Sequence, residues 1–404
     1  MGMLIIDEIH YPPPTPSVLD ILGGAGSYSV LGARLLRKPE NSHLIGWTVH
    51  VGNDFPAKVL EEIKSWKTNV NLIDTPERQT TRAWNKYGAN EYREFKYLTP
   101  KIRIDETQLT ENHLLAKVFH LICSPSRCIA LVKGIRKACE NIISASDSGV
   151  KDEAGVVLKL HNTPLFVWEP VPDSCTPEEL PRALEALKYV DVISPNHHEL
   201  ESLFGETGKD LFGASELQVL ERQCNELLIQ GFGKKPSAVV VRRGERGVFI
   251  ASDTGLTWLP AYHRPLDELR KEEQPKWTQK VIDPTGGGNA FLGGFCQGLL
   301  VEGRTKFEEA AIYGTVAASF AIEQIGMPAL SYTINGEELW NGVAVRERLE
   351  EFRKEQKRGM AGDRKSFKTS SYQPIKIKLL GNETGAIERI WTDFDGTQYV
   401  PVED

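Results

Sequence analysis

Long apolar runs and cysteine pairs are both missing from this sequence. No stretch reaches the ~18 consecutive apolar residues of a transmembrane helix. The first residues, MGMLIIDEIHYPPP, have no basic segment and too short an apolar run for a signal peptide. Six cysteines occur in 404 residues, none of them in a C-x-x-C pair. Because a chain of this length needs no disulfides for stability, we expect reduced thiols in a cytoplasmic protein.

An excess of positive charge is absent as well. The chain has 48 Lys and Arg against 55 Asp and Glu, a formal net charge of −7. Such a surface gives no electrostatic reason to bind nucleic acid or membrane phosphates, so we expect neither as a partner. With 40% hydrophobic and 8% aromatic residues, the chain can bury a core.

Short apolar runs alternate with helical patterns along most of the chain. Strands are expected at Met3–Asp7, Ile45–Gly52, Lys117–Cys123, Leu165–Glu169, Val190–Ser194 and Ala238–Arg242. Helices are expected at Ser27–Leu36, Phe55–Trp66, Pro177–Lys188, Glu216–Gln230, Gly286–Leu300 and Lys306–Gln324, with one more from about residue 124 to residue 142. This alternation predicts an α/β fold, with a mainly parallel sheet between helices and a ligand crevice at the carboxyl ends of its strands.

Four segments break the alternation. Thr80–Thr99 has alternating aromatic residues around a turn, which predicts an exposed hairpin that covers a site as a lid, or an ordinary β excursion. The charged stretches His263–Lys280 and Glu351–Ser371 indicate mobile, solvated insertions. Near the end, Ile375–Leu380 and Ala386–Trp391 favour a second hairpin.

The stretch VIDPTGGGNAFLGGFCQGLL carries the strongest chemical signal. A strand end reaches Asp283, and Gly286, Gly287 and Gly288 then lead into a helix. Unpaired amides at a helix N-terminus, together with the helix dipole, form a site for a phosphoryl group or a developing anion. The alternative is a glycine-rich bend that serves only packing.

Two common nucleotide motifs do not occur. The pattern G-x-x-x-x-G-K-[ST] is missing, which excludes a Walker-type loop. Gly24-Ala25-Gly26 is only part of G-x-G-x-x-G, because Ser29 stands at the third glycine position. A nicotinamide-dependent oxidoreductase would rest on that fragment alone.

Two further segments have chemical potential. Asn196 and Glu199 lie one helical turn apart and could hold hydrated Mg²⁺, or they could form a helix N-cap and capping box. The adjacent His197 and His198 are expected to face different directions on the surface. In VVVRRGERGVFI the turn is either a plain hairpin or a nucleotide contact, with Arg242 or Arg243 near phosphate.

Taken in this order, the segments resemble the PfkB, or ribokinase-like, sugar-kinase family over roughly residues 2–328. The resemblance implies a three-layer α/β/α sandwich with a small β lid, ATP and Mg²⁺ as cofactors, and a phosphoryl acceptor that is a sugar, nucleoside or similar molecule. A fungal branch linked in name to killer-virus maintenance resembles the chain most. The implied substrate-binding residues are Asp7, Gly23, Gly24, Tyr28 and Asn53.

On the nucleotide side, Asn196 to Glu199 matches the family's N-x-x-E, whose glutamate organises magnesium. The implied nucleotide-binding residues are Asn196, Arg242, Gly244, Gly247, Thr285 and Gly286. Asp283 could serve its own loop or a monovalent cation.

The family signature D-[ST]-x-G-A-G-D ends here in Asn289 instead of the catalytic aspartate. The implied catalytic residues are therefore Asn289 with Gly286, Gly287 and Gly288. A carboxamide cannot accept the substrate's proton, and losing a general base typically costs about 10²–10⁴ in rate. Tyr28 also replaces a family asparagine, and Trp84 and Tyr87 would make the pocket more aromatic.

Two functions follow from the resemblance. The first is an ATP-dependent small-molecule kinase, and the second is a ribokinase-fold protein that binds nucleotide or a metabolite as a scaffold or regulator. We expect a kinase domain over residues 1–334 with the lid at 80–99, followed by a charged, partly mobile extension over 335–404. A homodimer could form through the lid.

Overall fold

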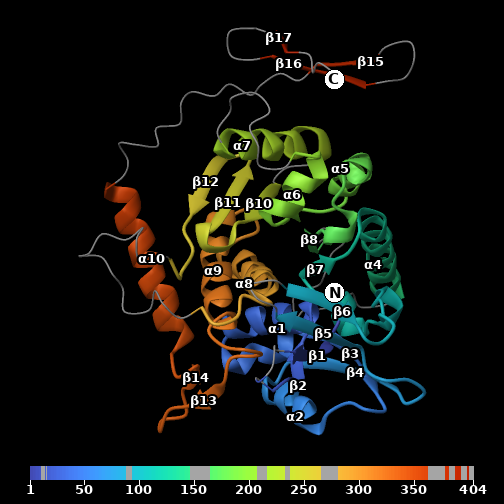
Figure 1. Ribbon diagram of the computed structural model, residues 1–404, viewed down its shortest axis with the longest axis vertical. Coiled ribbons are helices and arrows are strands. Elements are labelled where there is room, and N and C mark those ends of the chain that lie inside the picture. The colour runs from blue at the N-terminus through green and yellow to red at the C-terminus, as the bar shows by residue number, and fades with distance from the viewer. Residues whose placement is uncertain are drawn as a thin grey trace. The chain divides into compact units, whose positions relative to one another are not determined.

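The computed structural model describes residues 1–10, 14, 16–87, 93–145, 164–206, 216–232, 237–264 and 281–362, together with three short strands beyond them (Figure 1). The chain divides into two compact units, Met1–Arg353 and Lys354–Asp404. The first unit therefore runs past the expected boundary at residue 334. No described helix is long and apolar enough to span a bilayer. All six cysteines are free thiols.

The main sheet of the first unit has six strands in the order β12-β11-β10-β9-β8-β7. Strands β7 to β10 run parallel, and β11 and β12 are added in antiparallel fashion. The strands are β7 (Val118–Ile122), β8 (Leu165–Glu169), β9 (Val192–Ile193), β10 (Ala238–Arg242), β11 (Val248–Ser252) and β12 (Gly255–Leu259).

The parallel strands β7 to β10 are buried on both faces of the sheet, to which successive side chains of a strand point in turn. In β8, Leu165 and Val167 join one core cluster, whereas Phe166 and Trp168 join the other. The first cluster contains residues of α1 (Ala25–Leu35), α8 (Gly287–Glu302) and α9 (Phe307–Ala321). The second contains residues of α4 (Pro125–Ala145), α5 (Leu180–Leu187), α6 (His197–Phe204) and α7 (Glu216–Glu226). The expected three-layer α/β/α sandwich is confirmed (Figure 1).

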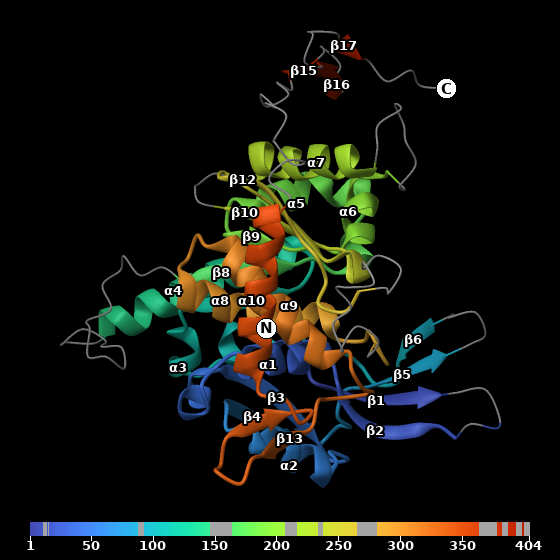
Figure 2. The same ribbon diagram turned by 90° about the vertical axis from the view of Figure 1, so that its left-hand side faces the viewer.

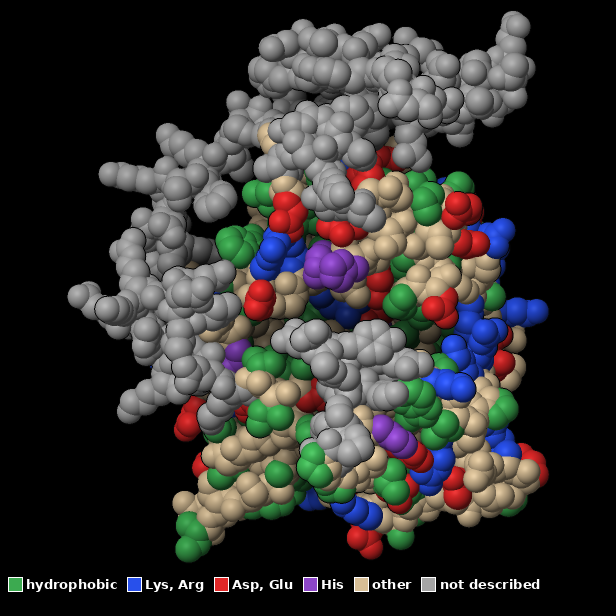
Figure 3. Space-filling view, in the orientation of Figure 1, with side chains coloured by type: hydrophobic (Ala, Val, Ile, Leu, Met, Phe, Trp, Pro, Cys, Tyr) green, Lys and Arg blue, Asp and Glu red, His purple; other side chains and the backbone are tan. Residues whose placement is uncertain are grey.

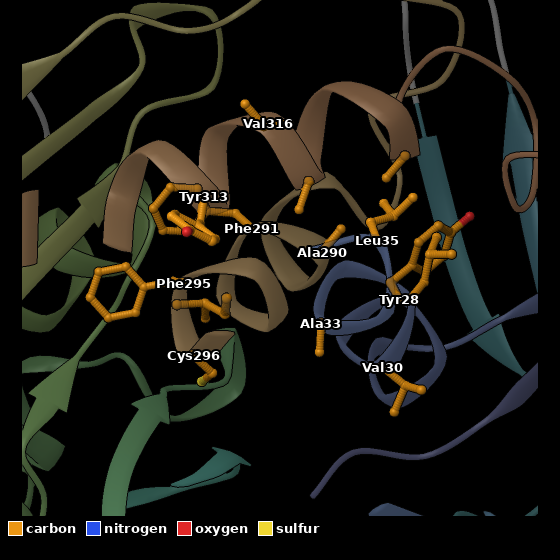
Figure 4. Packing of buried hydrophobic residues seen from close by; sticks show 14 of the residues in the cluster. Tyr28, Val30, Ala33, Leu35, Ala290, Phe291, Phe295, Cys296, Tyr313 and Val316 are labelled. Carbon is orange, nitrogen blue, oxygen red and sulfur yellow. The ribbon is translucent and has the colours of Figure 1, made fainter. Parts of the chain in front are cut away.

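Glycines bring α1 and α8 into close contact. A Cβ at Gly32 would lie 2.0 Å from the carbonyl oxygen of Ala290, and one at Gly293 would lie 1.9 Å from that of Ser29. Apolar side chains of α1, α8 and α9 surround this contact (Figure 4). The contact holds the middle of α1 against the first two turns of α8.

A smaller sheet has the order β2-β1-β5-β6 and projects from the helical layers (Figure 2). Its strands are β1 (Ile5–His10), β2 (Val18–Gly23), β5 (Arg82–Tyr87) and β6 (Arg93–Tyr97), and β5 and β6 form an antiparallel hairpin. The first strand was predicted to end at Asp7, which is wrong. Asp7 lies in mid-strand opposite Ile21 and Ala83, because the apolar alternation continues to the buried Ile9.

A parallel pair, β3 (Gly46–Gly52) and β4 (Asn69–Thr75), flanks α2 (Ala57–Ser65) in sequence, and the short α3 (Glu111–Leu114) precedes β7. The hairpin β13 (Leu330–Tyr332) and β14 (Glu338–Trp340) leads to α10 (Val345–Gly362). The prediction of a mobile insertion is wrong for Glu351–Gly362, because this stretch is helical and its apolar Phe352 is buried.

Most of His263–Lys280 lies outside the described residues, as does the stretch after Gly362 up to Lys378. In the second unit, β15 (Lys378–Gly381), β16 (Ile387–Thr392) and β17 (Gln398–Tyr399) pair in antiparallel order. The expected C-terminal hairpin is confirmed, with a third strand added to it.

Candidate active site

The glycine bend before α8 is held by its own aspartate. The backbone N–H and the hydroxyl of Thr285 donate to Oδ1 of Asp283 over 3.0 and 2.7 Å. Gly286 caps the helix with φ 76°, a conformation that a side chain would strain. Asp283 was expected either to stabilise its own loop or to bind a monovalent cation, and these bonds support the first role.

Two side chains lie directly against the bend. A Cβ at Gly286 would lie 2.2 Å from the ring of Tyr28, and one at Gly288 would lie 2.2 Å from Nη1 of Arg242. A Cβ at Gly287 would meet Ile322 at 2.7 Å. The glycines therefore serve packing, and they also bring a guanidinium to the N-terminus of α8.

Arg242 is anchored by three groups at the carboxyl ends of the parallel strands. Its Nη1 lies 2.7 Å from Oε1 of Glu169. Its Nη2 donates to the carbonyl oxygen of Ser194 over 3.0 Å and lies 3.4 Å from Oε2 of Glu199. The positive guanidinium of Arg242 lies beside the positive end of the α8 dipole. This arrangement favours the binding of an anion.

Glu169 is the residue at the centre of this network that the sequence analysis missed. Its Oε2 accepts a hydrogen bond from Nδ2 of Asn289 over 2.8 Å and lies 3.0 Å from Nε2 of His120. Burial by itself would raise the pKa of Glu169, but Arg242, His120 and Asn289 lower it to about 2. Its position at the end of a buried parallel strand was the signal that could have identified it.

His120 completes the chain of contacts from Glu169 to α1. Its Nδ1 hydrogen-bonds with the hydroxyl of Ser29 at 2.7 Å. Burial lowers the pKa of His120, so the ring is neutral at pH 7 and can donate from Nε2 to Glu169. The orientation of Asn289 is thus set by residues from three elements.

Asp7 interacts electrostatically with Asp283 of the glycine bend. Its side chain is buried, and Oδ1 has no hydrogen-bond partner among the described residues. A Cβ at Gly23 would lie 1.9 Å from Oδ2 of Asp7, so only glycine leaves room for the carboxylate. Burial, and next the charge of Asp283, raise the pKa of Asp7 to about 7.

Two neighbours of Asp7 shape the same region. Tyr97 of β6 interacts electrostatically with Asp7 and Asp173, and burial with these charges raises the pKa of its phenol. Gly24 caps α1 with φ 90°, and a Cβ there would lie 2.5 Å from the carbonyl oxygen of Met3. The start of α1, which carries Tyr28, is therefore fixed against the first strand.

Some expected pocket residues have other partners. Asn53 is exposed, and its amide donates to the carbonyl oxygen of Pro76 over 3.1 Å. Trp84 lies against the ring of His10, with centroids 5.9 Å apart. The side chain of Tyr87 lies outside the described residues.

Asn196 and Glu199 form the capping box of α6. The backbone N–H of Asn196 donates to Oε2 of Glu199 over 2.7 Å, and that of Glu199 donates to Oδ1 of Asn196 over 2.8 Å. Burial raises the pKa of Glu199. The helix-capping interpretation is therefore correct, and it leaves Oε1 of Glu199 without a partner among the described residues.

Within the described ranges, no cluster of three His, Cys, Asp or Glu side chains could hold a metal ion. A single carboxylate oxygen of Glu199 fits a hydrated Mg²⁺ that is bound mainly by phosphates, through water. The prediction that His197 and His198 face different directions is wrong, because their rings lie 3.8 Å apart at the start of α6.

The turn between β10 and β11 contains both expected nucleotide-side glycines, with φ 56° at Gly244 and 82° at Gly247. A Cβ at Gly247 would lie 2.1 Å from the carbonyl oxygen of Leu259, whereas Gly244 faces open space. Arg243 and Arg246 pair with Glu216. The turn thus presents its backbone at Gly244, and its arginines Arg243 and Arg246 are held in ion pairs.

Figure 3 shows a depression with acidic and basic side chains in its depth. Four of the predicted site residues belong to one network of contacts. Asn289 and Arg242 both contact Glu169, and Arg242 also contacts Ser194 and Glu199. Glu199 in turn bonds to Asn196. The structure also joins Tyr28 to Gly286 and Asp7 to Gly23.

A profile of the pfkB family carbohydrate kinases matches residues 16–331. The chain belongs to the PfkB family. An uncharacterised protein of Schizosaccharomyces pombe is 34% identical over 87% of this chain and 91% of its own length. Protein MAK32 of Saccharomyces cerevisiae is 31% identical over 86% and 89%. A candidate ribokinase II from Escherichia coli, solved with ATP and Mg²⁺, aligns with TM-score 0.56 at 18% identity, over 88% of this chain and 97% of that one. The PfkB resemblance and its fungal branch are confirmed.

Proposed function

We propose that this PfkB protein transfers a phosphoryl group from ATP to a hydroxyl of a sugar, nucleoside or similar small molecule. The observation that carries the proposal is the guanidinium of Arg242 beside the N-terminus of α8. A phosphoryl group that gains charge during transfer is stabilised by fixed positive groups of this kind. When bound, ATP would supply that group, and Mg²⁺ bound through water near Glu199 would neutralise its oxygens.

The acceptor would bind between the glycine bend and the small sheet. Asp7, Tyr28 and Tyr97 border this region, and Asp283 adds a second carboxylate. Carboxylates accept hydrogen bonds from hydroxyls and repel anions. The residues therefore favour an uncharged polyol over a substrate that already carries a phosphate.

The hairpin of β5 and β6 would cover this region as a lid.

The outer residues Val18, Leu19 and Phe95 of the small sheet have 42, 58 and 50% of their surface exposed. Exposed apolar residues on one sheet support a contact between two copies of the chain. Sedimentation equilibrium of the wild type and of Leu19→Glu tests that contact, and a monomer in both cases contradicts it.

Phosphorylation of D-ribose, cytidine and myo-inositol by ATP and Mg²⁺ tests the activity, with product detected by ³¹P NMR. The blocked control is Gly288→Leu, whose side chain would displace Arg242 from the bend. We expect turnover by the wild type and a loss of at least ~10²-fold in the control, as typical when an oxyanion donor is removed.

A second variant restores a family-type base. Asn289→Asp combined with Glu169→Gln exchanges the acid and the amide of the 2.8 Å pair, which keeps one carboxylate and one hydrogen bond. Asn289→Asp alone would place two carboxylates in contact, so the exchanged pair is the better probe. Absence of turnover in both the wild type and this double variant, with every acceptor, contradicts a kinase.

A second candidate is a nucleotide-binding protein without catalysis. Asn289 favours it, because its amide already donates to Glu169 and cannot take a proton. Calorimetry with ATP and Mg²⁺ separates the two functions. Tight binding without product supports a scaffold or regulator, whereas turnover rules out that interpretation.

A further inference from the structure

The acceptor hydroxyl must lose its proton, and Asn289 cannot take it. Glu169 is the carboxylate that accepts a hydrogen bond from Asn289, and it also contacts both Arg242 and His120. With its pKa lowered to about 2, Glu169 is also a weak base at pH 7. It acts as a positioning residue for Arg242 and Asn289.

Asp283, which interacts with Asp7, and Asp173, which interacts with Tyr97, are also less suited to take this proton. Asp283 uses Oδ1 for the backbone and hydroxyl of Thr285, and the loop needs both bonds to keep its shape. Asp173 is exposed on the loop after β8, where water competes for its carboxylate.

Asp7 differs from all three. Its side chain is 93% buried by surface area, since 7% remains exposed, and its Oδ1 has no partner among the described residues. A buried acceptor without a partner is costly unless a ligand satisfies it. Charged or titratable groups face it from two elements, Asp283 from the loop before α8 and Tyr97 from β6. Neither neutralises it.

The position of Asp7 relative to the bend follows from two contacts. Asp7 packs on Gly23, next to the cap of α1, and Tyr28 in the first turn of α1 packs on Gly286. The electrostatic interaction with Asp283 links Asp7 to the same loop. An acceptor between these groups would meet Oδ1 of Asp7 on one side and the helix N-terminus on the other.

We propose that Asp7 is the general base of this chain, in the role that Asn289 cannot fill. This inference rests on the proposed kinase function. The hydroxyl O–H bond breaks and its proton moves to Oδ1 of Asp7, while the oxygen forms a bond to the γ-phosphorus. The bond from that phosphorus to the bridging oxygen breaks, and ADP leaves with the electron pair. Asp7 then releases the proton to water.

The test compares Asp7→Asn with the wild type in ATP-dependent phosphorylation of D-ribose, cytidine and myo-inositol. We expect kcat to fall about 10²–10⁴-fold, as for loss of a general base. The wild-type kcat/KM should rise with pH and level off above about 7, following the pKa of Asp7 in the free enzyme, and the variant should lose this dependence. Asp253→Asn, in the exposed turn after β11, is the matched control and should retain both kcat and the pH profile.

A rescue separates the base from a group that only binds substrate. Asn289→Asp with Glu169→Gln, added to Asp7→Asn, should recover at least ~10-fold of the lost kcat, because it supplies a new carboxylate at the helix N-terminus. If Asp7→Asn raises KM but leaves kcat intact, Asp7 is not the base although the kinase stands.

A readout without turnover completes the design. In ¹³C-labelled protein, the carboxyl resonance that Asp7→Asn removes should titrate near pH 7 in the absence of ligands. A resonance that titrates near its usual value of 3.8 contradicts the base role alone. No turnover in any protein, the exchanged pair included, contradicts the kinase and the base together.

Discussion

Ionisation of the Asp7 carboxyl costs more free energy in the folded protein than in the unfolded chain. Its folded pKa is about 7, against a usual value of 3.8. The folded state therefore holds the proton more tightly, and the free energy of unfolding falls as pH rises from about 4 to 7. This cost is expected where function places a carboxylate in a buried position.

The first prediction concerns this cost. Asp7→Asn should raise the free energy of unfolding at pH 8 by up to about 4 kcal/mol and leave it unchanged near pH 3, where the carboxyl is protonated in both states. Urea unfolding at both pH values measures it, with Asp253→Asn as the control. A gain of equal size at both pH values means that the ionisation of Asp7 is not the cause.

Arg242 is the second residue whose loss can be predicted. Arg242→Met leaves Glu169 buried with only His120 and Asn289 as partners, so we expect about 3–5 kcal/mol of destabilisation at pH 7. Arg246→Met is the control, because Arg246 is exposed and its pair with Glu216 contributes about 0–1 kcal/mol. If urea unfolding gives both variants the same free energy of unfolding, the Arg242–Glu169 pair has no structural role.

At the scale of elements, α10 is joined to the turn after α9 by a buried ion pair. Arg348 lies 2.9 Å from Oε1 of Glu323 and donates to the hydroxyl of Ser319 over 3.0 Å. His263 lies 3.2 Å from the same carboxylate oxygen, and Asn341 donates to Oε2 of Glu323 over 3.1 Å. The N-terminal half of α10 is thus part of the first unit, and the loop before α8 pairs with the neighbouring Ile322.

Arg348→Met should therefore destabilise the protein by about 3–5 kcal/mol, because it leaves the buried carboxylate of Glu323 with only His263 and Asn341 as partners. The control lies on the same helix. Arg346 is 87% exposed and pairs with Glu350 one turn away, so Arg346→Met should cost about 0.3–0.5 kcal/mol. Thermal unfolding distinguishes them, and equal melting temperatures contradict the docking role of Arg348.

At the scale of the whole molecule, the end of the first unit can be tested by truncation. A chain that ends at Gly362 keeps Trp340, Leu349 and Phe352, which belong to the core cluster of α1, α8 and α9. A chain that ends at Ile334 loses all three, and each contributes about 1.5–3 kcal/mol by burial. We expect the longer chain to unfold like the full protein and the shorter one to be unfolded or aggregated. Cooperative melting of the shorter chain at the full-length temperature contradicts this.

The sequence by itself was sufficient for the layers and for most of their elements. Buried parallel strands such as Leu165–Glu169 and Ala238–Arg242 were predicted to the residue, because continuous apolar runs between polar segments have few other interpretations. The glycine bend and the capping box were identified for a similar reason, since their interactions join residues within about one helical turn.

Tertiary structure alone decided which distant residues meet. Glu169, His120 and Arg242 come from separate strands, and no local pattern shows that they converge on Asn289. The extension of the first strand past Asp7 depended on pairing with Val18–Gly23 and Arg82–Tyr87, both of which follow it along the chain. Chain order determines the local periodicity of side chains, whereas burial and charge at a site depend on contacts between segments far apart in sequence.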